Sequence, residues 1–98
     1  MSKVKIKDKE YPFKITLSAL MKYEDEFDKS FSDQAGGMKV KEMVSLLFYG
    51  LEAGARLSKN ELELSKEDLA DKLDMAEMNE AMMAALKDMG VEDPNPKP

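Results

Sequence analysis

Carboxylates are the reactive groups that this chain supplies in greatest number, and a pair of carboxylates can act as general acid and general base. Twenty of the 98 residues are acidic, and Glu24 with Asp28 and Glu63 with Glu67 form pairs at helical spacing. In so acidic a chain such pairs arise from composition alone. A catalytic carboxyl group needs a pKa raised by burial, and nothing around these pairs predicts burial. We therefore expect a solvated acidic surface, no catalytic residue and no enzymatic activity.

Metal and phosphate sites are also disfavoured. The chain has no histidine and no cysteine, which removes the imidazole and thiolate ligands and the commonest general base. A calcium-binding loop starting at Asp28 fails because Asp33 replaces the glycine of the sharp turn and Lys39 replaces the bidentate glutamate. The glycines at 36–37 lack the spacing of a phosphate-binding loop. We expect neither a metal nor a cofactor.

A methionine-rich stripe near the C-terminus is the strongest candidate for a binding surface. Its residues recur at three- and four-residue spacings, as in the seam of a coiled coil, and thioether side chains adapt to varied helical partners. The predicted partner-binding residues are Met75, Met78, Met82, Met83, Leu86 and Met89. The alternative is that the stripe fills the protein's own core against the helix expected at 40–55, which is the more general use of an amphipathic face.

Charge and hydropathy narrow the other partner classes. The net charge of −5 has the wrong sign for a phosphate backbone, so we expect no nucleic-acid binding, and lysines near the N-terminus alternate with apolar residues as on the outer face of a strand. No apolar run approaches the roughly 18 residues of a membrane span, and the first residues lack the apolar segment of a secretory signal. We expect a cytoplasmic protein that binds no membrane.

These candidate residues must be positioned by a mostly α fold. Period-two alternation predicts a short N-terminal β-hairpin at 3–15, and apolar periodicity predicts four helices near 17–28, 38–55, 66–73 and 75–89. Thr16 or Ser18 can begin the first helix, Ser65 with Asp68 the third, and Asp74 with Glu77 the fourth. We expect one small globular helical domain over 1–90, a flexible loop at 28–37 and a flexible proline-rich tail at 91–98.

The expected core comes from the apolar faces of these elements. Its residues are Ile6, Phe13, Leu17, Leu20, Phe27, Val44, Leu47, Phe48, Leu51, Leu69 and Leu73. On the second helix, Lys41, Glu42, Ser45 and Glu52 lie mostly opposite the apolar face and are expected in solvent.

Four segments, taken in order, resemble the tail assembly chaperones of long-tailed phages and prophages. They are an aliphatic and acidic first helix at 17–24 (LSALMKYE), the sequence FDKS at 27–30, an aromatic pair followed by Gly-Leu at 46–51 (LLFYGL), and Leu-Ser before a leucine-rich helix at 64–74 (LSKEDLADKLD). The resemblance covers roughly residues 4–90. No residue of the methionine stripe matches a family motif, so its assignment depends on its side-chain chemistry.

The resemblance implies a chaperone in the bacterial host cytoplasm that binds the long helical tape-measure protein and keeps it soluble before the tail tube is built around it. It also implies a longer product, made by ribosomal frameshifting, whose added segment contacts the tail tube protein. The competing function is a self-assembling regulatory or structural adaptor that uses the methionine stripe as an oligomer interface. A DNA-binding role for the helix at 66–73 is disfavoured, because its acidic residues would face phosphates.

Overall fold

The N-terminal hairpin is built as its alternation predicts. In the computed structural model, which describes residues 2–30 and 38–88, strands β1 (Ser2–Ile6) and β2 (Lys9–Phe13) pair antiparallel with Ile6 opposite Lys9. Lys7, in the two-residue turn, has a φ of 58°, as the turns that suit a right-twisted hairpin require. Val4, Ile6 and Phe13 are buried, so one face of the hairpin belongs to the core.

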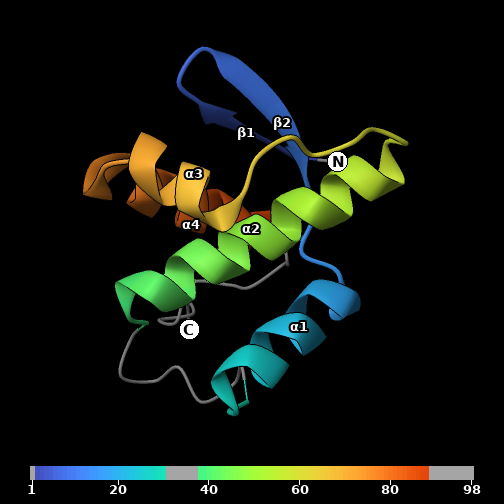
Figure 1. The fold of residues 1–98 in the computed structure, drawn as a ribbon, viewed down its shortest axis with the longest axis vertical. Helices are drawn as coiled ribbons and strands as arrows, with labels where there is room; N and C mark the ends of the chain where they lie inside the picture. The colour runs from blue at the N-terminus through green and yellow to red at the C-terminus, as the bar shows by residue number, and fades with distance from the viewer. Residues whose placement is uncertain (1, 31–37, 89–98) are drawn as a thin grey trace, which may run out of the picture.

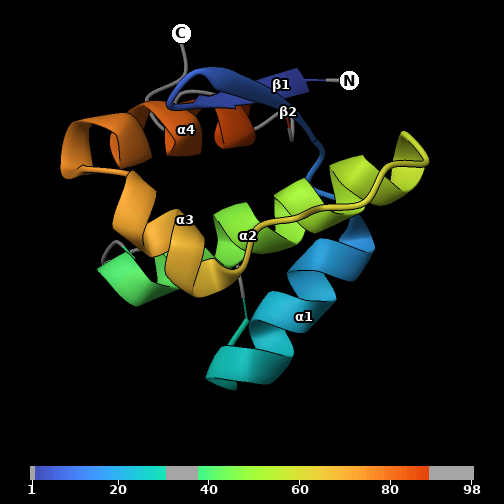
Figure 2. The ribbon, with the colours of Figure 1, turned by 45° about the horizontal axis from the view of Figure 1, so that its top comes forward.

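In the described residues, four helices follow the hairpin, which confirms the mostly α fold with its short N-terminal hairpin. They are α1 (Leu17–Phe27), α2 (Val40–Leu57), α3 (Lys66–Lys72) and α4 (Met75–Asp88). Helix α2 runs through the middle of the molecule, with α1 antiparallel to it on one side and α3 and α4 on the other (Figure 1). Turning the molecule shows the hairpin lying over α4 (Figure 2).

The helix boundaries follow the predicted start signals. The Thr16 hydroxyl accepts a hydrogen bond from the Ala19 amide at 3.1 Å, which identifies Thr16 as the N-cap of α1. Ser65 and Asp68 form the reciprocal capping box that was expected before α3.

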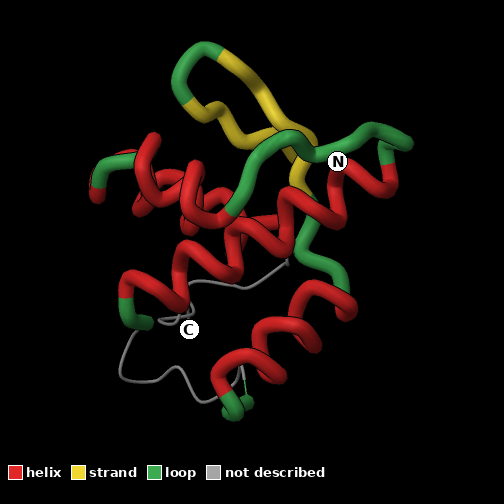
Figure 3. Tube along the Cα trace, viewed as in Figure 1, coloured by secondary structure: helices red, strands yellow, loops and turns green. Residues whose placement is uncertain are grey.

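After α2, an extended segment runs back across the molecule to Ser65 (Figure 3). Most of the predicted loop at 28–37, together with Met89 and the predicted tail at 91–98, lies outside the described residues.

The core forms where the hairpin, α2 and α4 meet, and most of the predicted core residues belong to it. Ile6, Phe13, Leu47, Leu51 and Leu69 are buried, and five more pack partly buried against them. These five are Leu20, Phe27, Val44, Phe48 and Leu73.

The prediction for Leu17 is wrong, because its side chain is 78% exposed. Helix α1 packs through Ala19 and Tyr23, which are 1% and 0% exposed, and a two-residue offset turns Leu17 about 200° away from Ala19. Met21, four residues after Leu17, is exposed on the same outer face. The buried face of α1 therefore includes Leu20 and Phe27, as predicted, but excludes Leu17.

The polar face of α2 was also predicted incorrectly in part. Glu42 and Ser45 are buried, at 4% and 3% exposure. Glu42 is covered at the point where the end of α1 approaches the start of α2, and Lys29 binds its carboxylate at 2.6 Å. The amphipathic pattern predicted solvent here because it registers polarity and not the ion pairs that allow a carboxylate to be covered.

Two glycines bring α2 into direct contact with β2. The Lys14 amide donates to the Gly50 carbonyl oxygen at 3.1 Å, and a Cβ on Gly50 would overlap the Phe13 ring. A Cβ on Gly54 would overlap the backbone carbonyl of Pro12. The helix was predicted to end at residue 55, but it continues to Leu57, so Gly54 lies inside the helix and is needed for this close approach.

Replacing Gly54 with alanine should destabilise the protein, although alanine is the better helix former by about 1 kcal/mol in an open position. The added methyl group meets the backbone of β2, which cannot move aside as a side chain can, so we expect a loss of about 1–3 kcal/mol in the free energy of unfolding. Urea denaturation measures it. Lys41→Ala, at an exposed position of the same helix, is the control and should change little; a gain in stability for Gly54→Ala would contradict the packing described here.

Candidate partner-binding groove

An apolar groove lies where the first turns of α2 meet the junction between α3 and α4. Its volume is about 280 Å³, and it is lined by Val40, Val44, Ala70, Leu73, Asp74, Met75 and Met78. We call it the Val40–Met75 groove. Val40 and Met75 form its accessible edge, at 53% and 51% exposure, whereas Met78 is 3% exposed. The groove thus combines a buried apolar floor with exposed apolar edges.

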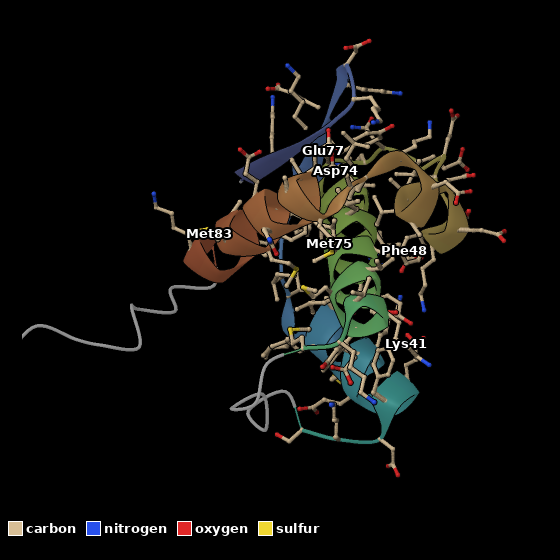
Figure 4. The ribbon with its side chains drawn as sticks, turned by 90° about the vertical axis from the view of Figure 1, so that its left-hand side faces the viewer. Lys41, Phe48, Asp74, Met75, Glu77 and Met83 are labelled. Atoms are coloured by element: carbon tan, nitrogen blue, oxygen red, sulfur yellow. The ribbon has the colours of Figure 1, made fainter. Side chains whose placement is uncertain are left out.

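The tight junction between α3 and α4 positions Met75. Leu73 ends α3 in an extended conformation, and Asp74 begins α4. The Glu77 amide donates to the Asp74 carboxylate at 2.8 Å, and the Asp74 amide donates to the Glu77 carboxylate at 3.0 Å. This reciprocal capping box, which the sequence predicts, fixes where α4 begins and so holds Met75 at the edge of the groove (Figure 4).

The methionine stripe divides between the core and the surface. Met78 and Met82 are 3% and 6% exposed and pack with Ala81 and Ala85 in the central cluster. This is the core packing that was the alternative to partner binding. A partner would reach these two side chains only if α4 moved, so the predicted seam is not a continuous surface.

The other stripe residues do not gather at one place. Met83 is 71% exposed and lies towards the far end of α4 from Met75 (Figure 4). Leu86 belongs to α4, although its side chain is outside the described part of the structure, and Met89 lies outside the described residues. Of the six predicted residues, Met75 and Met78 line the groove. Val40, Val44 and Leu73 complete it from other elements.

A polar cluster formed by Glu26, Tyr49 and Lys66 links three helices. The Tyr49 hydroxyl and the Lys66 ammonium both donate to Glu26 Oε1, at 2.6 and 2.7 Å. The Lys66 nitrogen also lies 4.8 Å from the centroid of the Tyr49 ring, within cation–π range. The cluster therefore ties α1 to α2 and α3. Sequence reasoning missed it, because the partners of Glu26 are 23 and 40 positions away.

The electrostatics of this cluster favour structure over catalysis. Burial alone would raise the pKa of Glu26, but the hydrogen bonds from Lys66 and Tyr49 lower it below its ordinary value. Burial and the bond to Glu26 raise the pKa of Tyr49. Burial would lower the pKa of Lys66, yet its bond to Glu26 raises it. Each group is thus held in its ordinary protonation state at neutral pH, which suits a fixed contact and not proton transfer.

Glu42 makes a comparable contact at the start of α2. Its carboxylate accepts a hydrogen bond from Lys29 and another from the Lys39 amide, at 2.6 and 2.9 Å. The bond from Lys29, followed by that from the Lys39 amide, lowers the pKa of Glu42 below its ordinary value. The carboxylate also lies in the first turn of the helix, where negative charge is favoured. Glu42 therefore fastens the end of α1 to the start of α2.

Metal ligands, membrane-spanning helices and similarity to known proteins give no further indication of function. Over residues 2–30 and 38–88, no group of three or more histidine, cysteine, aspartate or glutamate residues could hold a metal ion. No helix in the same part of the chain is long and apolar enough to cross a bilayer. No protein-family model, curated protein or solved structure matches the chain.

The burial of Met78 beside the exposure of Met75 predicts opposite effects of one substitution. Met78→Glu places a carboxylate in the core without a partner and should lower the free energy of unfolding by more than about 3 kcal/mol. Met75→Glu, at the half-exposed edge, should change it by less than about 0.5 kcal/mol. Thermal denaturation followed by circular dichroism compares the two. Equal stability of both variants would contradict the placement of α4.

The low pKa of Glu42 predicts a loss of stability in acid. A carboxyl group whose pKa is lower in the folded protein stabilises it above the unfolded value, near 4.5, and loses this effect as the pH falls through the folded value. Glu42→Gln should be less stable than the wild type at pH 7, and its stability should fall less steeply below about pH 5. Urea denaturation across the pH range measures both.

The control for this experiment is Glu61→Gln, which removes an exposed carboxylate. It should keep the stability of the wild type at pH 7. A wild-type slope in Glu42→Gln would show that the ion pair with Lys29 does not contribute to stability.

Proposed function

We propose that this chain is a non-enzymatic tail assembly chaperone, which binds the helical tape-measure protein and keeps it soluble during phage tail assembly. The observation that carries the proposal is the Val40–Met75 groove, whose exposed edge and buried floor are apolar. An amphipathic client helix can insert an apolar side chain into such a groove. The proposal places the chain in the cytoplasm of the bacterial host, with the tail tube protein as a further partner.

The groove can hold an apolar side chain of a client. Its volume of about 280 Å³ lies just below the range of about 300–1,000 Å³ that is usual for small-molecule pockets. Val44 and Leu73 give it aliphatic walls, and Met75 can change its rotamer to fit different side chains. Adaptable walls suit a client that presents many different apolar residues along one long helix.

The order of the sequence segments supports the same function. The stretch that resembles the family at 46–51 includes Gly50, which allows the close contact with β2. The stretch at 64–74 forms the capping boxes of α3 and α4 and ends at the groove. Of the four resembling stretches, the one at 64–74 thus contributes to the groove, through Ala70, Leu73 and Asp74.

The self-assembling adaptor has less support. That function needs the methionine seam as an interface between copies, but Met78 and Met82 are buried within one copy. The exposed members, Met75 and Met83, are apart on α4 (Figure 4). An oligomer would therefore have to form through a surface other than the methionine stripe.

Co-expression with the tape-measure protein of the same genome tests the proposal. We expect affinity capture of the client and an increase in its soluble fraction. Val40→Glu combined with Met75→Glu should reduce capture about ten-fold or more, because charges at the edge would have to be desolvated by the client helix.

The matched control is Met21→Glu combined with Leu57→Glu, which adds the same charges at exposed apolar positions outside both the groove and the methionine stripe. It should capture the client as the wild type does. No capture by a folded wild-type chain would overturn the chaperone function, and a stable oligomer by light scattering would then favour the adaptor. An equal loss of client capture in both double variants would overturn the assignment of the groove as the binding site.

A further inference from the structure

Strand β1 has an outer edge whose backbone groups point away from the hairpin. Pro12 has no N–H, so Pro12 and Lys3, which lie opposite each other, cannot exchange a pair of hydrogen bonds. Because bonded and non-bonded pairs alternate in an antiparallel ladder, the bonds to β2 come from Ser2, Val4 and Ile6. The N–H and C=O groups of Lys3 and Lys5 therefore face outwards, and in the described part of the chain the sheet has no third strand.

A groove runs along this outer edge, between β1 and α4. Its volume is about 490 Å³, and it is lined by Lys3, Val4, Lys5, Lys7, Glu77, Glu80, Ala81 and Ala84. The hairpin lies above α4 in this region (Figure 2). Ala81 and Ala84 give the α4 wall small side chains, which leave space beside the strand. An added strand could thus pair with the outward backbone groups of β1 and would fit in the groove beside it.

The charges beside the edge determine what can pair there. Lys3 and Lys5 are exposed and form no ion pair with any described residue, whereas Lys7 lies 3.8 Å from Glu77. A second copy pairing antiparallel through its own β1 would place lysine opposite lysine, which is destabilising. On the outer face, the edge therefore disfavours self-pairing and attracts acidic side chains. On the side of the groove formed by α4, Glu77 and Glu80 repel acidic side chains and leave that side to uncharged ones.

We propose that the β1 edge binds an extended segment of a protein partner in which acidic and small apolar residues alternate. The segment adds a third strand to the hairpin by pairing with the backbone of Lys3 and Lys5. Its acidic side chains lie beside these two lysines on the outer face. Its small apolar side chains point to the opposite face, towards Ala81 and Ala84. This site is separate from the Val40–Met75 groove and does not depend on the proposed chaperone function.

The test is an NMR titration of the whole chain with a blocked peptide of alternating glutamate and valine, beside a peptide of alternating lysine and valine. We expect the acidic peptide to shift the amide signals of Lys3 and Lys5 and to slow their hydrogen exchange, while the basic peptide does neither. Lys5→Glu should weaken binding about ten-fold by turning attraction into repulsion. Lys72→Glu, an equal charge change at an exposed position on α3, should leave it unchanged.

A second variant separates strand pairing from charge attraction. Lys5→Pro removes an outward N–H without removing a hydrogen bond to β2. It should therefore weaken binding of the acidic peptide more than Lys5→Ala does. If Lys5→Pro does not fold, hydrogen exchange in the wild type distinguishes strand pairing from charge attraction, because only strand pairing slows exchange of the Lys3 and Lys5 amides. No binding to the wild type, or binding without amide protection, would overturn the proposal and leave the lysines as a guard against edge pairing. Concentration-dependent protection without peptide would overturn it in favour of a second copy.

Discussion

The close contact between α2 and β2 is the constraint on which the rest of the structure depends. With only a hydrogen for a side chain, Gly54 lets the helix lie against the backbone of the strand, and Gly50 leaves room for the Phe13 ring. This fixes the hairpin on one side of α2 and turns Phe13 and Ile15 into the core. The opposite face of the hairpin carries exposed lysines, among them Lys3 and Lys5. Once the hairpin is fixed, α4 can pack only beneath it, and the short junction after α3 then determines where the Val40–Met75 groove forms.

Much of this architecture could be predicted from local signals. Alternation identified the hairpin, the capping pairs at Ser65 and Asp74 marked two helix starts, and the spacing of Leu47 and Leu51 identified the buried face of α2. These features depend on residues a few positions apart, which a single sequence displays directly. The exposure of Leu17 was not predictable in the same way. Leu17 and Leu20 are both leucines on the same apolar stripe, and which of them packs against the core depends on how α1 lies against α2.

The candidate groove was predictable only in part, for a similar reason. Met75 and Met78 stood out by composition, but Val40, Val44 and Leu73 come from other elements and join them only through tertiary packing. Periodicity identifies an apolar stripe without stating whether the stripe faces the protein or a partner. The contacts of Glu26 and Glu42 were hidden as well, since an acidic residue on a helix is ordinarily solvated and each contact needs a basic residue from another element.

The position of the hairpin over α4 also affects the order in which the protein can fold. The α1 and α2 pair consists of neighbours in the chain, so its contacts can form early. Val4 and Ile6, near the beginning, share their cluster with Ala81 and Met82, and closing so long a loop is slow. During synthesis from the N-terminus, Val4 and Ile6 therefore wait for their contacts with Ala81 and Met82 until α4 has left the ribosome. In that interval both the apolar face of β1 and its edge lack the cover that α4 later provides. Lysine opposite lysine disfavours pairing between the β1 strands of two nascent copies of this chain.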